Sequence, residues 1–312
     1  MNTKKLLQIG PLPRGLEQRL GQRYDLHPLW TEPDRARFLE NSKGRFAGGV
    51  TMSRHGCPAD IFSLLQGTVV ACFGVGYEGL DLEAAKRHDV QVSTTPNVLN
   101  DCVADCAFAL VLSVARRIVA ADRFVQKGLW PTEAFGLGTR VSGKKLGIVG
   151  LGRIGRAIAL RAGGFGMDVR YHGPRARPDA PYPFEPDLIS LANWADFLVV
   201  ACPGGDRTRN LVSVDVLRAL GTEGYLINIA RGSIVDEEAL VQAIVNQSIA
   251  GAGLDVYQHE PHVPPQLLDN DRVVLLPHIA AGTRETRAEM EKLVEDNLES
   301  FFRSGKVLTP PG

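Results

Sequence analysis

The stretch Lys145-Leu-Gly-Ile-Val-Gly-Leu-Gly-Arg-Ile-Gly-Arg156 decides the fold of the chain. Its apolar residues 146–149 predict a buried strand, and apolar residues at helical spacing over 154–162 predict a helix. Between them Gly150, Gly152 and Gly155 keep the spacing G-x-G-x-x-G, which is typical of a dinucleotide-binding turn. The spacing alone is weak evidence, because glycine-rich turns are common. The strand before it and the helix after it favour dinucleotide binding over a simple turn.

Strands and helices alternate on both sides of this turn, which predicts parallel sheets covered by helices on both faces. The fold class is therefore α/β, with two doubly wound parallel-sheet domains and a ligand cleft between them. The predicted strands lie near residues 4–10, 24–29, 46–52, 69–75 and 90–94 and, from the turn onwards, near 146–149, 167–171, 197–201, 225–229, 249–254 and 273–276.

Three further segments set the domain boundaries. One long helix is predicted from about residue 103 to 126, a long loop over 129–142, and an amphipathic helix over 283–303 before a frayed tail. A final helix of this length can return to the first domain. We therefore assign residues 1–98 plus 284–312 to a substrate domain and residues 99–283 to the dinucleotide-binding domain.

The composition narrows the classes of partner. The 312 residues include 35 basic and 35 acidic side chains, and this zero net charge gives no support for a nucleic-acid or membrane partner. No long apolar run follows the N-terminal lysines, so no signal peptide is expected. The five cysteines include no Cys-x-x-Cys pair, which favours reduced thiols in a cytoplasmic protein over disulfides or a metal site.

Three side chains with complementary chemistry follow strands of the second domain. Arg231, Glu260 and His278 each come soon after a predicted strand, and strand ends of a parallel sheet meet at one ligand-binding edge. Arginine binds a carboxylate through two hydrogen bonds, and histidine moves protons near neutral pH. A glutamate that contacts the imidazole would orient it and favour its charged form. Each residue alone could equally be an ordinary surface or turn residue, but three at equivalent positions favour a catalytic set.

Beside the glycine-rich turn, further motifs are Gly74-Val-Gly-Tyr-Glu-Gly-Leu-Asp81, Pro96-Asn-Val-Leu-Asn-Asp-Cys-Val-Ala-Asp105, Asn228-Ile-Ala-Arg-Gly-Ser-Ile-Val-Asp236, Gly253-Leu-Asp-Val-Tyr-Gln-His-Glu-Pro261 and Pro277-His-Ile-Ala. Together these motifs resemble the D-isomer-specific 2-hydroxyacid dehydrogenase family over nearly the whole chain. Within the family, the stretch Val199-Val-Ala-Cys-Pro-Gly-Gly-Asp-Arg-Thr-Arg-Asn210 looks closest to glyoxylate/hydroxypyruvate reductases. The resemblance implies a flavodoxin-like substrate domain and a Rossmann NAD(P)-binding domain.

The resemblance also implies roles for individual residues. His278 would protonate the carbonyl of a 2-oxo acid, Glu260 would tune His278, and Arg231 would hold the substrate. The expected substrate contacts are Met52, Ser53, Val75, Gly76 and Phe135. The expected cofactor contacts are Val103, Gly150, Gly152, Arg153, Ile154, Gly155, His172, Gly173, Pro174, Arg175, Arg177, Cys202, Pro203, Thr208, Ile229, Ala230, Asp255 and Ala280, and no metal is expected.

The end of the second strand of the nucleotide domain bears on cofactor choice. NAD usually needs an acidic residue there to bind the ribose hydroxyls, but His172 and Gly173 fill that position. Arg175 and Arg177 follow, and either could pair with a 2′-phosphate, although both could equally be solvated loop charges. The sequence therefore predicts a preference for NADP(H), with NAD(H) as the second cofactor.

The predicted function is the NADPH-dependent reduction of a small 2-oxo acid such as glyoxylate or hydroxypyruvate. Two alternative enzymes are a 2-ketogluconate reductase and a 3-phosphoglycerate dehydrogenase. A different class of protein, a nucleotide-sensing binding protein like the family's corepressors, could keep the same site residues. The resemblance further implies a homodimer that docks through the nucleotide domains, in which Phe135 would reach the neighbouring site.

Overall fold

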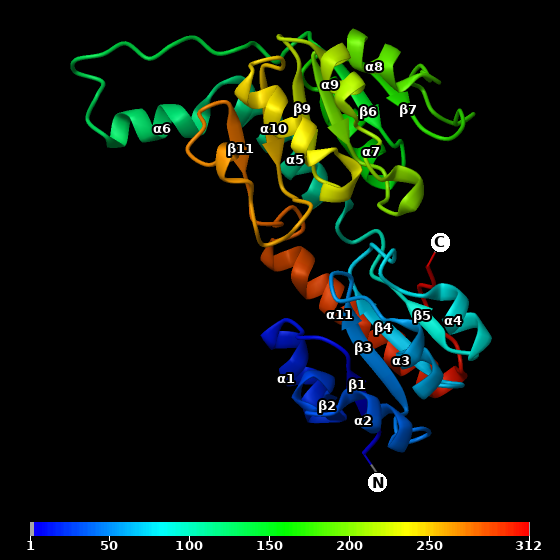
Figure 1. Cartoon of the computed structure of the whole chain (residues 1–312). Helices are drawn as coiled ribbons and strands as arrows, with labels where there is room; N and C mark the ends of the chain where they lie inside the picture. The colour runs from blue at the N-terminus through cyan, green and yellow to red at the C-terminus, as the bar shows by residue number, and fades with distance from the viewer. Residues whose placement is uncertain (1–2, 312) are drawn as a thin grey trace. The chain divides into compact units, whose positions relative to one another are not determined.

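The structure is a computed structural model, and it describes residues 3–311. The chain divides into two compact units, which are described separately (Figure 1). Unit 1 combines the chain up to Leu99 with the chain from Thr283 onwards, and unit 2 spans Asn100–Gly282. The C-terminal helix therefore belongs to the same unit as the N-terminal strands.

Unit 1 is built on a five-stranded sheet in the order β2-β1-β3-β4-β5, and every pair of neighbouring strands is parallel. This is the flavodoxin-like doubly wound order. Its elements are β1 (Lys5–Gln8), α1 (Arg14–Arg23), β2 (Asp25–Pro28), α2 (Arg35–Asn41), β3 (Gly48–Met52), α3 (Ala59–Leu64), β4 (Val69–Phe73), α4 (Leu82–Arg87), β5 (Gln91–Ser93) and α11 (Arg284–Ser304), with a short 3₁₀ turn at Leu29–Thr31.

The sequence explains where several of these helices begin. Asp34, Asp81 and Thr283 are N-cap residues, and each side chain accepts a hydrogen bond from a backbone N–H of the first turn. At the other end of α11, Gly305 takes the left-handed conformation (φ 70°) that commonly stops a helix. Apolar side chains of α3 and α4, such as Phe62 and Ala84, pack with those of the strands, such as Val70, into one buried core.

The C-terminal tail is anchored, so the prediction of a frayed tail is wrong. Thr309 pairs with Thr94 beyond the end of β5: its carbonyl accepts from the Thr94 N–H at 3.0 Å, and its hydroxyl donates to the Thr94 carbonyl at 2.6 Å. Asn297, fully buried on α11, accepts from the N–H groups of Leu308 and Thr309 and donates to the Thr309 hydroxyl. The polar composition of the tail suggested solvation, whereas its backbone is bound by a buried amide.

Unit 2 contains a six-stranded parallel sheet in the order β11-β10-β9-β8-β6-β7. Its elements are α5 (Asn100–Ala115), α6 (Ile118–Gln126), β6 (Lys145–Val149), α7 (Arg153–Gly163), β7 (Asp168–His172), α8 (Leu188–Trp194), β8 (Phe197–Val200), α9 (Val214–Leu220), β9 (Tyr225–Asn228), α10 (Glu237–Val245), β10 (Gly251–Leu254) and β11 (Val273–Leu275), with short 3₁₀ turns at Asp206–Thr208, Gly232–Ile234 and Pro265–Leu267.

One isolated contact completes the Rossmann order. Phe184 forms a parallel bridge with Tyr171 of β7, and the neighbouring backbone hydrogen bonds lie on the edge of β7 that faces away from β6. With this bridge as an extra short strand, the order from that edge is the Phe184 segment, β7, β6, β8, β9, β10 and β11. Numbered along the chain of unit 2, this is the order 3-2-1-4-5-6 of dinucleotide-binding sheets, followed by one more strand. The prediction of two parallel-sheet α/β domains is thus confirmed.

The predicted long helix over 103–126 is two helices. Arg117 lies between α5 and α6 in the left-handed region (φ 54°), where a side chain interrupts a right-handed helix. The carbonyl of Ala115 accepts instead from the N–H of Thr139 at 2.7 Å, a residue of the following loop. The apolar periodicity continues across the break, so the sequence pattern could not reveal it. Beyond the break, α6 and the following loop extend away from the sheet of unit 2 (Figure 1).

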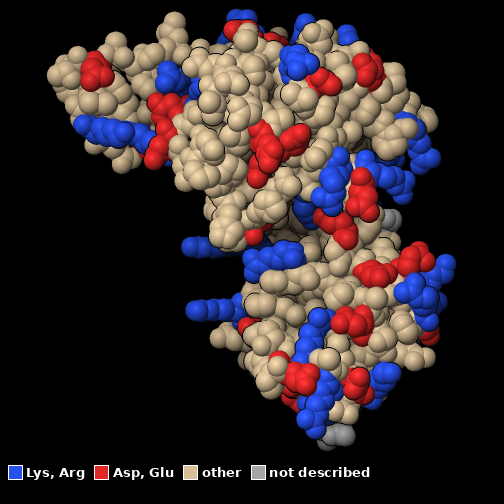
Figure 2. Space-filling view, viewed as in Figure 1, with Lys and Arg blue, Asp and Glu red and all other residues tan. Residues whose placement is uncertain are grey.

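Charges are mixed over the surface that Figure 2 shows, where Lys and Arg side chains lie among Asp and Glu side chains. Many of them form ion pairs, such as the two bonds that Arg19 of α1 makes to Glu291 and Glu295 of α11, at 2.7 and 2.6 Å. Within residues 3–311, every helix is too short or too polar to cross a membrane.

Candidate active site

The glycine-rich turn has the geometry that its sequence predicts. Gly150 adopts φ 101°, and a Cβ there would lie 2.6 Å from Cα of Cys202. The chain after β6 therefore packs against the chain after β8 too closely for any side chain at position 150. A Cβ on Gly155 would lie 2.1 Å from the carbonyl oxygen of Gly150, so only glycine allows α7 to pack this closely. By contrast, the Cβ position of Gly152 faces open space. The turn therefore has one open side, at the N-terminus of α7.

That open side fits the phosphates of a dinucleotide. Gly152 is the N-cap of α7 and provides no side chain to bind the first N–H groups of the helix. Arg153 and Ile154 begin the helix at this position, and Arg153 is exposed. Unpaired N–H groups and the helix dipole together favour an anion here.

The loop after β7 carries the residues that the sequence linked to the ribose. His172 ends the strand with Nδ1 3.1 Å from the carbonyl of Glu185, and Gly173 has open space at its Cβ position. Pro174, Arg175 and Arg177 are exposed. The loop is nevertheless fixed, because the N–H of Arg177 donates to the buried hydroxyl of Tyr171 at 2.7 Å. Neither His172 nor its successor supplies the carboxylate typical of NAD sites.

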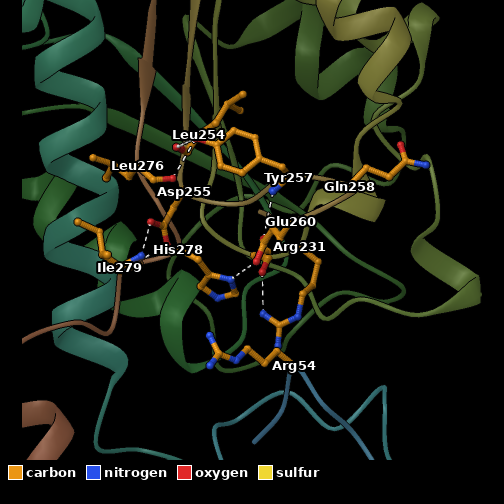
Figure 3. Close-up of polar contacts among 12 residues, drawn as sticks. Arg54, Arg231, Leu254, Asp255, Tyr257, Gln258, Glu260, Leu276, His278 and Ile279 are labelled. Carbon is orange, nitrogen blue, oxygen red and sulfur yellow. Dashed lines mark hydrogen bonds and ion pairs between the residues drawn. The ribbon is translucent and has the colours of Figure 1, made fainter. Parts of the chain in front are cut away.

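Arg231, Glu260 and His278 converge at the carboxyl edge of the unit 2 sheet (Figure 3). They follow β9, β10 and β11, which are adjacent strands. Nδ1 of His278 lies 2.8 Å from Oε2 of Glu260, and the guanidinium of Arg231 points towards the same carboxylate (Figure 3). Burial acts to raise the pKa of Glu260, but its bond to His278 and the nearby charges of His278 and Arg231 prevail and lower the pKa. Glu260 is thus an anion that orients two cation-forming side chains.

Asp255 shapes the turn that presents His278. Its two carboxylate oxygens accept from the N–H groups of Ile279 and Ala280 at 2.7 and 2.9 Å, and its carbonyl accepts from the N–H of His278 at 2.9 Å. His278 itself has a positive φ of 54°, a conformation that non-glycine residues adopt rarely and often at functional sites. Burial raises the pKa of Asp255, which is fully buried. Asp255 was predicted as a cofactor contact, and within unit 2 both of its carboxylate oxygens bind backbone amides.

The turn that carries Arg231 is fixed by its neighbours. The side chain of Asn228 accepts from the N–H of Ala230 at 3.1 Å and donates to the carbonyl of Arg231 at 2.9 Å. Nη1 of Arg231 also donates to the carbonyl of Ala230 at 2.7 Å. Next to it, a Cβ on Gly232 would lie 1.9 Å from the backbone carbon of Tyr257, so the turn packs directly on the chain that leads to Glu260.

Tyr257 connects the Glu260 segment to the strand that precedes His278. Its hydroxyl donates to the carbonyl of Leu276 at 2.9 Å, and its backbone N–H donates to Oε1 of Glu260 at 3.2 Å. Burial raises the pKa of Tyr257, so the phenol stays protonated and remains a donor. The three catalytic candidates are thus joined by a second set of residues, namely Asn228, Gly232, Asp255 and Tyr257.

Three of these supporting residues were not predicted as parts of the site, although they lie in the family motifs: Asn228, Gly232 and Tyr257. An asparagine two residues before a tight turn is one available signal, because its amide can bind the turn backbone. The roles of Gly232 and Tyr257 depend on chain segments that meet only in the folded unit.

The remaining cofactor candidates follow strands of the unit 2 sheet, except Val103, which lies on α5. Ile229 and Ala230 follow β9 and are buried. Cys202 and Pro203 follow β8, and the carbonyl of Pro203 accepts from the hydroxyl of Thr208 at 2.8 Å. Burial raises the pKa of Cys202 to about 11, so this residue is a neutral thiol rather than a nucleophile at neutral pH. On α5, Val103 is buried, and the thiol of its neighbour Cys102 donates to the carbonyl of Ala280.

The substrate candidates of unit 1 lie at the carboxyl ends of β3 and β4. Met52 ends β3 and Ser53 follows it, and a Cβ on Gly74 would lie 1.7 Å from Oγ of Ser53. Gly74 accordingly adopts φ 136°. Val75 and Gly76 come next, and within residues 3–311 their N–H groups donate to no backbone carbonyl. Two consecutive amides of this kind suit a carboxylate.

Phe135, the last substrate candidate, belongs to unit 2. Its ring is 5.3 Å from the ring of Phe124 on α6, and the guanidinium of Arg117 stands 4.7 Å above it. Within unit 2 the aromatic ring therefore packs inside the segment formed by α6 and the loop over 129–142. Its predicted place at a neighbouring site stays a prediction.

Comparison with known proteins assigns the family. The model of the D-isomer specific 2-hydroxyacid dehydrogenase, NAD binding domain, matches residues 108–280. The chain is 41% identical over 311 residues to glyoxylate/hydroxypyruvate reductase A of Arabidopsis thaliana, covering 99% of each protein. It is 43% identical over 306 residues to 2-ketogluconate reductase of Gluconobacter oxydans, covering 98% of this chain and 97% of the relative. The chain therefore belongs to the D-isomer specific 2-hydroxyacid dehydrogenase family, as its motifs predicted.

Solved structures agree with this assignment. The crystal structure of an NADPH-dependent glyoxylate/hydroxypyruvate reductase from Sinorhizobium meliloti, in complex with NADP and malonate, is 37% identical and superposes with a TM-score of 0.90. It matches 99% of this chain and 97% of its own. A 2-hydroxyacid dehydrogenase from Ketogulonicigenium vulgare, also 37% identical, gives a TM-score of 0.92 over 99% and 98% of the two chains. These likenesses support a nicotinamide cofactor for the site.

Proposed function

We propose that the protein reduces a small 2-oxo acid, glyoxylate or hydroxypyruvate, to the 2-hydroxy acid with NADPH. The observation that carries this proposal is the His278–Glu260 pair, 2.8 Å apart, with Arg231 directed at the same carboxylate. The three residues share the carboxyl edge of the sheet that carries the glycine-rich turn. A proton donor, its orienting anion and a carboxylate-binding guanidinium are the groups that reduction of a 2-oxo acid requires.

The residues divide the chemistry between them. Because Nδ1 of His278 is bound to Glu260, Nε2 is left to hold the proton that the substrate carbonyl oxygen receives. Arg231 binds the substrate carboxylate and orients the neighbouring carbonyl, a task that needs its planar pair of donors. Val75 and Gly76 of unit 1 offer two backbone amides to the same kind of anion. When bound, the nicotinamide cofactor supplies the hydride that the carbonyl carbon gains.

The preference for NADPH is supported by the loop after β7. His172 and Gly173 present no carboxylate to repel a 2′-phosphate, and Arg175 and Arg177 are exposed next to them. We expect Arg175→Ala to raise the apparent KM for NADPH much more than that for NADH. Equal effects on the two cofactors would contradict this assignment of Arg175.

The relatives favour two kinds of substrate. Glyoxylate/hydroxypyruvate reductases and a 2-ketogluconate reductase align over nearly the whole chain. A panel of glyoxylate, hydroxypyruvate, 2-ketogluconate and 3-phosphohydroxypyruvate with both reduced cofactors, followed by loss of cofactor absorbance, ranks them. Turnover of glyoxylate or hydroxypyruvate with NADPH at the highest kcat/KM is the expected result. Cofactor binding without turnover of any acid would favour the sensor alternative instead.

We further propose that the enzyme is a cytoplasmic homodimer formed through α6 and the loop over 129–142. This segment extends from unit 2 and exposes large apolar side chains: Ile118 (51%), Val125 (52%), Trp130 (69%) and Leu137 (96%). Apolar groups gathered in this way are typical of a protein interface. The family resemblance implies a homodimer that docks through the nucleotide domains, so the proposed occupant is a second copy of this chain. Cross-linking or sedimentation of the purified protein tests the oligomeric state.

A further inference from the structure

One ion pair joins the nucleotide helix to the loop after β7. Arg156, in the first turn of α7, donates from Nη2 to Oδ2 of Asp179 at 2.8 Å. Asp179 also experiences the charge of Arg177, and the bond to Arg156 is the main cause of the lowered pKa of its carboxyl. A carboxylate therefore lies near Arg177, one of the two arginines to which the preceding section assigns the 2′-phosphate.

The position of Asp179 is fixed by the fold. Tyr171 of β7 is 2% exposed, and its hydroxyl accepts from the N–H of Arg177. The carbonyl of Arg177 in turn accepts from the N–H of Ala180 at 3.0 Å, so the backbone on both sides of Asp179 is held. The loop thus has an anchor that does not depend on the ion pair. Side chains that are 35% and 73% exposed, as those of Arg156 and Asp179 are, form pairs that stabilise little.

A carboxylate and a phosphate bind guanidinium groups through the same charge-assisted hydrogen bonds. A 2′-phosphate, with about two negative charges at neutral pH, competes with a carboxylate for such a group and is repelled by it. An NAD ribose, with hydroxyls at this position, is subject to neither effect. A carboxylate here therefore acts on the choice between the two cofactors.

We propose that Asp179 is a specificity-determining residue for the cofactor, whose carboxylate binds Arg156 in the free protein and opposes the 2′-phosphate of NADP(H). Arg156 is then a third arginine, beside Arg175 and Arg177, that is available to this phosphate once it leaves Asp179. The inference rests on the proposed use of NADP(H). It adds that the carboxylate of Asp179 weakens the preference for NADP(H) over NAD(H).

The test is binding of two nucleotides that differ only in the 2′-phosphate, adenosine 2′,5′-bisphosphate and adenosine 5′-monophosphate, measured by calorimetry on the full chain. We expect Asp179→Asn to tighten the bisphosphate about threefold to tenfold at low salt, because one nearby like charge is removed. Binding of the monophosphate should change less than twofold. Arg156→Met should act in the opposite direction and weaken the bisphosphate selectively.

Asp215→Asn is the matched control, because Asp215 forms an equally short, exposed pair with Arg218 on α9 (2.9 Å). This variant should leave both affinities as they are. If Asp179→Asn and Arg156→Met both weaken the two nucleotides alike, the pair only anchors the loop and the inference is wrong. It is also wrong if Asp179→Asn leaves the ratio of the two affinities unchanged.

Binding of the two nucleotides to the unmodified protein tests the preference for NADPH separately from the role of Asp179. If it binds the bisphosphate no more tightly than the monophosphate, the preference fails. A gain of bisphosphate affinity in Asp179→Asn would still support the role of Asp179 in that case.

Discussion

Replacing Gly232 by alanine tests whether the turn that carries Arg231 depends on contact with the Glu260 segment. The new Cβ would lie 1.9 Å from the backbone carbon of Tyr257, 2.1 Å from its oxygen and 2.3 Å from the nitrogen of Gln258. Real Cβ atoms essentially never approach another heavy atom within 3.0 Å, so one of the two segments must move by about 1.1 Å (3.0 minus 1.9). All three neighbours are backbone atoms and cannot rotate away.

The cost can be estimated from this overlap. Overpacking a buried site costs about 1–3 kcal/mol, and contact with backbone places Gly232→Ala near the upper limit, at about 3 kcal/mol. In a unit of this size each kcal/mol corresponds to about 2–4 °C, so the melting temperature of unit 2 should fall by roughly 6–12 °C. A displacement of about 1 Å between Arg231 and Glu260 should lower kcat roughly 100-fold.

The assay combines thermal unfolding with kcat/KM for glyoxylate. Gly163→Ala is the matched control, because a Cβ there meets nothing within 4 Å and Gly163 lies at the end of α7. That variant should be as stable as the original or more so, by up to about 1 kcal/mol. If Gly232→Ala melts and turns over like Gly163→Ala, the packing of this turn does not set the geometry of the site.

Four further substitutions test other parts of the structure. Arg231→Lys should raise KM for the 2-oxo acid more than it lowers kcat, because lysine cannot make the paired hydrogen bonds of a guanidinium. His278→Ala should instead lower kcat, by about 10²- to 10⁴-fold. Steady-state kinetics of the two variants distinguish these effects. Asn297→Ala should lower the free energy of unfolding by about 1–3 kcal/mol in denaturant titrations, since it removes the acceptor of the Leu308 and Thr309 N–H groups. If the protein is the proposed dimer, Leu137→Glu should sediment as a monomer, whereas an unchanged dimer mass would exclude this loop from the interface.

The glycine-rich turn and the strand ends could be predicted because their signals are local. Gly150 and Gly155 need the absence of a Cβ, and the alternation of strands with helices places Arg231, Glu260 and His278 at one edge of a parallel sheet. The family motifs added the rest of the expected residue roles. Similarity to whole proteins then confirmed the family.

Other features depend on contacts between distant segments and could not be predicted. The break between α5 and α6 follows from a hydrogen bond across the loop to Thr139, and the apolar spacing on either side gives no sign of it. The tail is held by Asn297, a polar residue in the middle of an amphipathic helix. Asp179 lies beyond the strand end that usually decides between cofactors, so its bond to Arg156 emerges only when the loop is folded.

The contacts among these residues suggest why the site can be rigid although its three main side chains are partly exposed. His278 and Glu260 retain 44% and 31% of their side-chain exposure, and a pair this accessible does not by itself fix its own geometry. Side chains that bind the surrounding backbone fix the geometry instead. Asp255 binds the amides that follow His278, and Asn228 binds the turn of Arg231. Tyr257 joins the strand end to Glu260. These supporting residues hold the orientation, and in the proposed reaction His278 is left accessible to pass its proton to the substrate.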